Sequence, residues 1–251
     1  MTFIIAEVGV NHMGNLDFAK HLVTKAKEAG ADAVKFQLFD SELLQRPELK
    51  YLELTKDEIL KIYNHCYTQD IEFMCTPFDV EALEFLEPLV ERLKISSGCI
   101  GNVPLLEAAR DSHLPLILST GMSSIADVDF ALSIVHEATL LHCTSTYPCP
   151  IGEVNLRAMD TLADVFGMPV GYSDHTEGIV VPVAAVARGA TVIEKHLTLN
   201  RNSDGPDHKS SIEPESFRAM VEGIRLIEKA LGDGVKKPQA SEAPVMKVWK
   251  R

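Results

Sequence analysis

Short apolar runs alternate along the chain with longer segments in which apolar residues recur at helical spacing. The runs are rich in β-branched residues and end at polar ones, as expected of buried parallel strands. These predicted strands are residues 3–8, 33–38, 71–75, 93–96, 115–119, 139–143, 169–173 and 191–194. The predicted helices are residues 16–29, 55–67, 80–85, 104–110, 125–137, 156–166, 179–188 and 214–231. Eight strand–helix units within 251 residues predict an α/β fold, the (β/α)8 TIM barrel.

A doubly wound open sheet is the alternative arrangement of the same units. Such a sheet usually has fewer strands, and no Gly-x-Gly-x-x-Gly dinucleotide fingerprint follows the first predicted strand. We therefore expect residues 1–232 to form one barrel domain. Residues 233–251 begin with a polar stretch that contains glycine and proline, so we expect a linker-like segment there.

The composition is that of a globular protein without a nucleic-acid or membrane partner. Hydrophobic residues make up 46% of the chain, charged residues 24%, and the formal net charge is −12. This acidic balance excludes a basic nucleic-acid footprint, and no apolar run approaches the roughly 18 residues of a membrane span. No cleavage signal follows Met1, so we expect a cytoplasmic protein. The five cysteines form no Cys-x-x-Cys pair, which indicates packing residues rather than a disulfide or zinc framework.

Two histidines close the last two predicted strands. If these strands are neighbours in a barrel, His175 and His196 can reach one point at its mouth, where barrel active sites lie. Two imidazoles with open positions beside them suit a divalent transition metal that must also bind a substrate oxygen. A lone histidine is more often a surface residue or a satisfied core residue. Here both follow apolar strands and have polar neighbours on the same face, Ser173 and Glu194, which favours the metal site.

Two lysines lie within otherwise apolar strands. Burying a lysine costs free energy unless an anion pairs with it, so Lys35 and Lys94 are candidates for binding a carboxylate or a phosphate. The alternative is that each ammonium group reaches solvent at its strand end. Four hydroxyl residues at strand ends can add hydrogen bonds to the same anion. They are Thr76, Ser97, Ser119 and Ser173.

Two acidic residues leave alternatives open. Glu7 lies in a very apolar strand, where it can act as a general acid or base or only pair with a buried lysine. Asp207 lies in a turn fixed by Gly205 and Pro206, where it can bind a sugar hydroxyl or cap the turn.

Nine short motifs, in this order, resemble the sialic acid synthase family, which makes nonulosonic acids from phosphoenolpyruvate. The resemblance covers nearly the whole chain. The motifs are IIAEVGVNH at 4–12, VKFQ at 34–37, TPF at 76–78, KISSG at 94–98, STGM at 119–122, HCTSTYP at 142–148, YSDHT at 172–176, EKH at 194–196 and GPDH at 205–208. Each motif is weak by itself, whereas the ordered set is highly specific.

The resemblance implies a (β/α)8 barrel that condenses phosphoenolpyruvate with an N-acetylated amino-sugar aldehyde, such as N-acetylmannosamine, and releases phosphate. It implies that His175 and His196 ligate Mn²⁺, with Mg²⁺ or Co²⁺ as alternatives, and that Glu7 is an acid or base. It also implies a homodimer. The residues that would hold phosphoenolpyruvate are Lys35, Thr76, Lys94, Ser97, Ser119 and Ser173, and those that would contact the sugar are Gln37, Tyr147 and Asp207.

The chain departs from the family pattern at three places. Cys99 stands where the family often has an acidic residue, and the loop at residues 38–54 is short for the family. The family has a C-terminal antifreeze-like domain that covers the sugar site with an arginine from a partner subunit, and we expect this chain to lack it. These departures predict weak catalysis. They also leave two alternative functions: a related barrel synthase with a different aldehyde acceptor in surface polysaccharide synthesis, and a catalytically impaired barrel that binds phosphoenolpyruvate.

Overall fold

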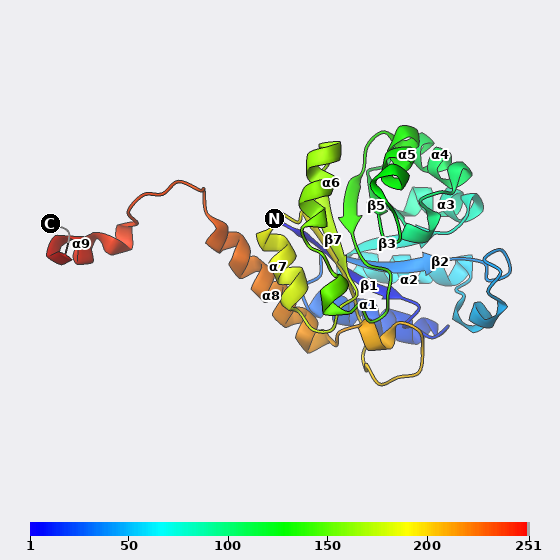
Figure 1. The fold of residues 1–251 in the computed structure, drawn as a ribbon. Coiled ribbons are helices and arrows are strands. Elements are labelled where there is room, and N and C mark those ends of the chain that lie inside the picture. Colours follow the sequence, from blue (N-terminus) through cyan, green and yellow to red (C-terminus); the bar gives the residue numbers. More distant parts are fainter. Residues whose placement is uncertain (250–251) are drawn as a thin grey trace.

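Eight parallel strands curl into a nearly closed barrel with helices around it (Figure 1), which confirms the predicted (β/α)8 fold. The computed structural model describes residues 1–249. The strands are β1 (Phe3–Gly9), β2 (Ala33–Leu38), β3 (Glu72–Pro77), β4 (Leu93–Ile95), β5 (Leu116–Ser119), β6 (Thr139–His142), β7 (Val170–Asp174) and β8 (Val192–His196). Their order is β3-β2-β1-β8-β7-β6-β5-β4, and the two edge strands, β3 and β4, pack against each other.

The helices follow the predicted periodicity, and side chains cap the first turns of α1 to α5. They are α1 (Leu16–Glu28), α2 (Lys56–Gln69), α3 (Val80–Leu86), α4 (Val103–Asp111), α5 (Ile125–Val135), α6 (Ala158–Phe166), α7 (Val180–Ala187) and α8 (Pro214–Leu231). Thr55 with Glu58, and Ser124 with Asp127, form reciprocal capping boxes at the starts of α2 and α5. Helix α5 ends two residues before its predicted end, because His136 has a φ of +69° and cannot continue a right-handed helix.

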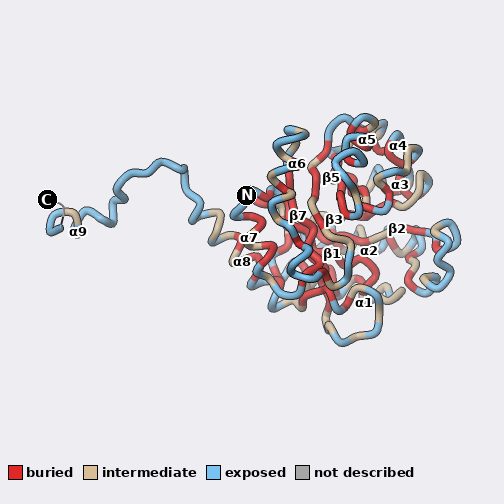
Figure 2. The backbone as a smooth tube through the Cα atoms, in the orientation of Figure 1, coloured by how far each residue is buried: buried red, intermediate tan, exposed pale blue. Residues whose placement is uncertain are grey.

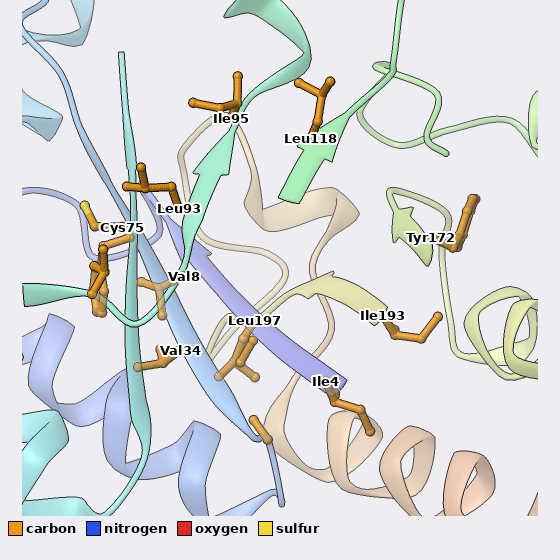
Figure 3. Packing of buried hydrophobic residues seen from close by; sticks show 14 of the residues in the cluster. Ile4, Val8, Val34, Cys75, Leu93, Ile95, Leu118, Tyr172, Ile193 and Leu197 are labelled. Atoms are coloured by element: carbon orange, nitrogen blue, oxygen red, sulfur yellow. The ribbon is translucent and has the colours of Figure 1, made fainter. Parts of the chain in front are cut away.

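The main hydrophobic core lies between the outer face of the barrel and the helices. Strand residues of one parity supply it, and Figure 3 shows Ile4, Val34 and Ile193 pointing away from the barrel axis toward the helices. Cys75 and Cys99 belong to this core, and all five cysteines are buried and free. Their burial agrees with the prediction that the cysteines are packing residues.

The opposite strand parity fills the barrel interior in two layers. The lower layer is apolar and consists of Ile5, Ala33, Met74, Ile117, Leu141 and Val192. Side chains two residues further along a strand lie on the same face. The upper layer is therefore mostly polar, since those positions hold Glu7, Lys35, Thr76, Ser119, Cys143 and Glu194. The alternation of side chains along each strand thus places an apolar layer beneath a mostly polar layer at the carboxyl ends of the strands.

The chain after α8, where the linker-like segment is expected, contains two short helical elements that the sequence does not predict. A 3-10 turn at Ala240–Glu242 and a short helix, α9 (Ala243–Trp249), follow an extended stretch. Figure 1 shows this segment projecting from the barrel, and Figure 2 shows it exposed along most of its length. Across residues 1–249, no helix has both the length and the apolar character that crossing a membrane requires.

Candidate active site

A cavity of about 520 Å³ opens at the carboxyl ends of the strands. Its volume is in the range of small-molecule sites. The twelve residues singled out from the sequence all line it. They are Glu7, Lys35, Gln37, Thr76, Lys94, Ser97, Ser119, Tyr147, Ser173, His175, His196 and Asp207. The barrel therefore brings together residues from all eight strand–loop units.

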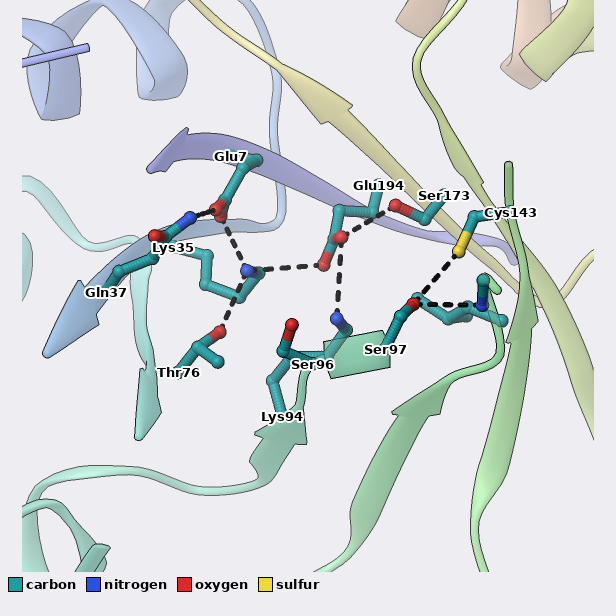
Figure 4. A network of polar contacts seen from close by, with 12 residues as sticks. Glu7, Lys35, Gln37, Thr76, Lys94, Ser96, Ser97, Cys143, Ser173 and Glu194 are labelled. Carbon is teal, nitrogen blue, oxygen red and sulfur yellow. Dashed lines mark hydrogen bonds and ion pairs between the residues drawn. The ribbon is translucent and has the colours of Figure 1, made fainter. Parts of the chain in front are cut away.

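Both lysines point into the cavity and meet carboxylates there (Figure 4). Lys35 Nζ lies 2.7 Å from Glu7 Oε2 and 3.6 Å from Glu194 Oε2, and Lys94 Nζ lies 3.6 Å from Glu194 Oε1. Each lysine is only 3% exposed, so the alternative in which the ammonium groups reach solvent is wrong. The contacts of 3.6 Å are longer than a strong charged hydrogen bond, so these ammonium donors have capacity for an added anion.

The two carboxylates of this cluster differ in their ionisation. Burial raises the pKa of Glu7 to about 7, although Lys35 acts to lower it. Burial also acts to raise the pKa of Glu194, but Lys35 and Lys94 outweigh it and hold that pKa at about 2. Ser173 Oγ also donates a hydrogen bond of 2.8 Å to Glu194 Oε1. Glu194 is therefore a fixed negative charge, whereas Glu7 exchanges its proton near neutral pH.

Hydroxyl groups surround the lysines on the side of β3 to β5. Lys35 Nζ donates to Thr76 Oγ1 at 3.0 Å, and Ser97 Oγ accepts from the Gly121 amide at 2.9 Å. Ser119 Oγ is buried without a hydrogen-bond partner among the described residues. A buried hydroxyl without a partner is costly unless a ligand satisfies it, so this wall is suited to an oxygen-rich anion.

The two histidines stand on the other side of the cavity, at the ends of the paired strands β7 and β8. Their ring centroids are 5.7 Å apart. His175 Nδ1 donates to Thr144 O at 2.7 Å, which leaves Nε2 with its lone pair. His196 Nδ1 is buried and has no hydrogen-bond partner among residues 1–249. Burial lowers the pKa of both imidazoles, so both are neutral, as metal ligands must be.

These observations fit one ion held by two histidines. Bonds of about 2.1 Å from each ring nitrogen are compatible with the ring spacing. The described part of the chain holds no cluster of three or more histidine, cysteine or acidic side chains placed for a metal. Tyr147 packs on His175 with ring centroids 4.1 Å apart and lies edge-on to His196.

Three polar side chains converge above Gly9. A Cβ atom at this glycine would lie 3.1–3.2 Å from Glu7 Oε1, Gln37 Nε2 and Asp207 Oδ2, and its φ is +54°, so glycine suits the position both sterically and conformationally. Gln37 Nε2 donates to Glu7 Oε1 at 2.9 Å. The Asp207 side chain makes no capping hydrogen bond in its turn, so the turn alternative is not supported. Burial raises the pKa of Asp207 to about 6.

Sequence reasoning missed a buried ion pair directly behind the histidines. Asp174 and Lys195 precede His175 and His196 and point outward from the barrel, and both are fully buried. Lys195 Nζ lies 2.6 Å from Asp174 Oδ2 and also donates to the Thr176 carbonyl. The pair therefore ties the ends of β7 and β8 together. The signal in the sequence was a lysine at an outward position of an apolar strand.

We expect Lys195→Met to lower the free energy of unfolding by about 3–5 kcal/mol, because it leaves the Asp174 carboxylate buried without its cation. Urea denaturation measures the change. Lys56→Met is the matched control, since it removes a 2.7 Å pair with Glu81 that is exposed and worth about 0–1 kcal/mol. Equal losses in the two variants would contradict the assignment of a structural ion pair.

Three further features of the cavity were not foreseen. Glu194 was singled out only as a neighbour of His196, whereas it is the anion between the two lysines. Arg46 and three leucines of the loop after β2, Leu44, Leu49 and Leu52, also line the cavity. Cys99 is 6% exposed, packs in the main core and is not among the described residues that line the cavity.

Known proteins resemble the chain over its whole length. The model of the NeuB family matches residues 45–236. An N,N'-diacetyllegionaminic acid synthase of Legionella pneumophila is 46% identical over 99% of this chain and 78% of its own length. The human N-acetylneuraminate-9-phosphate synthase is 37% identical over 93% and 72%. The crystal structure of an N-acetylneuraminic acid synthetase from Leptospira borgpetersenii superposes with a TM-score of 0.92 at 41% identity, covering 100% of this chain and 93% of that one.

Proposed function

Because the chain belongs to the NeuB family of synthases, we propose that it condenses phosphoenolpyruvate with an N-acetylated amino-sugar aldehyde, N-acetylmannosamine or a similar sugar, to give a nonulosonic acid and phosphate. One observation carries the proposal. Two buried lysines with ammonium donors left for an anion face two neutral histidines across a single cavity. Such a site holds an anion and a polarised carbonyl group close together, as this reaction requires.

Phosphoenolpyruvate would occupy the lysine side. Its carboxylate and phosphate match the ammonium groups of Lys35 and Lys94, and the unsatisfied Ser119 hydroxyl faces the same space. Thr76, Ser97 and Ser173 complete this set of donors. The lysines would also stabilise the phosphate as it leaves.

The aldehyde would lie on the histidine side. An ion held by His175 and His196 supplies Lewis-acid polarisation of the aldehyde oxygen when it is bound. Tyr147, Gln37 and Asp207 line the space next to the histidines and would orient the sugar. The identity of the ion as Mn²⁺, Mg²⁺ or Co²⁺, the homodimer and the cytoplasmic location stay predictions.

The proposed reaction forms one carbon–carbon bond, and at carbon 2 it replaces the carbon–oxygen bond to phosphate with one to the oxygen of water. Carbon 3 of phosphoenolpyruvate attacks the aldehyde carbon, and the aldehyde oxygen takes up a proton. Water adds to carbon 2 and loses a proton, which balances the proton taken up by the aldehyde oxygen. The tetrahedral intermediate then expels phosphate, which takes the remaining hydroxyl proton, to leave a 2-oxo acid. Glu7, with its pKa of about 7 and its place between Lys35 and Gln37, is the residue best suited to hold the transferred proton.

Phosphate release tests the proposal. Phosphoenolpyruvate, Mn²⁺ and a panel of amino-sugar aldehydes are incubated with the protein, and inorganic phosphate is measured with and without each aldehyde. Release that depends on an aldehyde supports the synthase. Phosphoenolpyruvate binding without release from any aldehyde would favour the impaired, binding-only barrel.

We expect Lys35→Ala and Lys94→Ala each to weaken phosphoenolpyruvate binding by about 1.5–3 kcal/mol, the scale of a charged hydrogen bond, or roughly 10- to 150-fold in Kd. Titration calorimetry measures both. Lys56→Ala, which changes an exposed lysine outside the cavity, is the control and should bind like the wild type. Unchanged affinity in both cavity variants would place the anion elsewhere.

A further inference from the structure

A second cavity lies beside the active-site cavity. It has a volume of about 720 Å³ and lies between the first turns of α5 and α6, next to the end of β6. It is here called the α5–α6 cavity. Three side chains line both cavities, those of Met122, Cys143 and Ser145. A thin partition of side chains therefore separates the two spaces.

This partition adjoins the lysine side of the active site. Cys143 Sγ lies 3.4 Å from Ser97 Oγ (Figure 4), and Ser97 belongs to the hydroxyl groups around Lys94. A Cβ atom at Gly121 would lie 3.0 Å from Ser97 Oγ, 2.9 Å from Cys143 Sγ and closer still to Ser145 Oγ, so these three groups surround one glycine. An anion beside Ser97 is therefore one residue away from Ser145 and the α5–α6 cavity.

The lining of the α5–α6 cavity is polar and lacks carboxylates. None of its described lining residues is Asp or Glu, although these two types supply 36 of the 251 residues. Seven of the lining side chains carry a hydroxyl group. Those of Thr120 and Thr144 donate to backbone carbonyls, whereas those of Ser145 and Thr146 make no hydrogen bond within the described chain. Free hydroxyl donors without a carboxylate suit an oxyanion and not a metal cation.

Arg157 supplies the one positive charge among the lysines and arginines of this lining. It is exposed and precedes α6, and its guanidinium group makes neither a hydrogen bond nor an ion pair within residues 1–249. The other seven arginines of the described chain each donate to a carboxylate or a carbonyl oxygen. Arg157 therefore has all five donors available, in the planar arrangement that matches phosphate.

We propose that the α5–α6 cavity is a phosphate site, in which Arg157 receives the phosphate that leaves the lysines. The inference rests on the proposed function, in which phosphate is released beside Lys35 and Lys94 while the sugar product occupies the histidine side. Phosphate that crosses the partition reaches solvent at the exposed Arg157 without passing the sugar product. One exposed cation holds an oxyanion weakly, with a Kd on the order of 1 mM, which suits an ion that must also depart.

The binding test uses inorganic phosphate and the metal-free protein. The ³¹P line width of phosphate should increase with added wild-type protein, and part of this increase should persist when phosphoenolpyruvate fills the lysine site. Arg157→Gln should weaken the persistent binding by about tenfold or more, the scale of a charged hydrogen bond. Arg110→Gln is the matched control, because Arg110 is 37% exposed, pairs with Asp111 and lies in neither described lining. It should bind like the wild type.

Turnover tests whether the cavity receives the product. The 2-oxo acid is measured with an aldehyde that supports the reaction, while inorganic phosphate is added. Added phosphate should lower the kcat of the wild type even at saturating phosphoenolpyruvate, because an occupied cavity obstructs departure. In Arg157→Gln, inhibition by phosphate should become competitive with phosphoenolpyruvate, and Arg110→Gln should behave like the wild type.

The outcomes separate this inference from the proposed function. Loss of all phosphate binding once phosphoenolpyruvate fills the lysine site would overturn the second site, and so would equal binding by wild type and Arg157→Gln. Purely competitive inhibition in the wild type would overturn its role in phosphate release. If no aldehyde supports turnover, the proposed function fails, whereas the ³¹P comparison still decides whether the α5–α6 cavity binds phosphate.

Discussion

The His175→Ala, His196→Ala double variant is expected to lose Mn²⁺ binding and to lower turnover by about two orders of magnitude or more, because Lewis-acid polarisation supplies several kcal/mol. The variant should still fold. His175 contributes one hydrogen bond, to Thr144 O, and the buried His196 Nδ1 contributes none within the described chain. Calorimetry measures Mn²⁺ affinity, and circular dichroism measures the fold.

His142→Ala is the control for this pair. His142 ends the neighbouring strand β6, but its Nε2 is bonded to Val154 O at 2.7 Å, and it does not belong to the described lining of the active-site cavity. Mn²⁺ affinity should therefore match the wild type. If the double variant binds Mn²⁺ as tightly as the wild type, these histidines are not the metal ligands.

The fold could be predicted from the sequence because each barrel strand carries its own pattern. Strands buried on both faces give apolar runs such as Ile4 to Ala6, and the helices that cover them have caps and an apolar stripe. The short helix α9 was not foreseen, because seven residues without a buried face give no periodic signal. The strand ends differ by a residue or two from the predicted ranges, as hydrogen bonding rather than polarity decides where a strand stops.

Individual residues of the candidate site could be predicted from the strand in which each one lies. The contacts that they make with residues of other strands could not. Polar residues at the ends of apolar runs are visible in the sequence, which is why Lys35 and His196 could be found. Their partners are not visible. The barrel stagger sets Glu194 between two lysines from other strands, and no spacing along the chain encodes that contact. Leu44 and Leu49, which also line the cavity, escaped notice because leucines in an irregular loop resemble ordinary packing residues.

Charge balance links the fold to the proposed reaction. Glu194 stays ionised between Lys35 and Lys94 and holds them in the barrel before any substrate arrives. Without it, two ammonium groups in a low-dielectric interior would repel each other. With it, the lysines can share their donors with an incoming anion, and Glu7 is left as the group whose protonation changes near neutral pH.

Glu7→Gln should lower turnover by about 10²–10⁴-fold with little change in phosphoenolpyruvate affinity, because it removes a positioned proton donor and preserves its size. Burial raises the pKa of Glu7 to about 7, so its carboxyl is protonated below that pH and ionised above it. If the protonated form delivers a proton to the aldehyde oxygen, wild-type turnover falls as pH rises through about 7, and the variant lacks this limb. The measurement is kcat against pH for both proteins.

Glu72→Gln, at the opposite end of β3, is the control, since Glu72 pairs with Arg92 outside the cavity. A wild-type rate that instead rises with pH would make Glu7 the base that deprotonates water, and an unchanged rate in the variant would leave Glu7 as no more than a partner of Lys35.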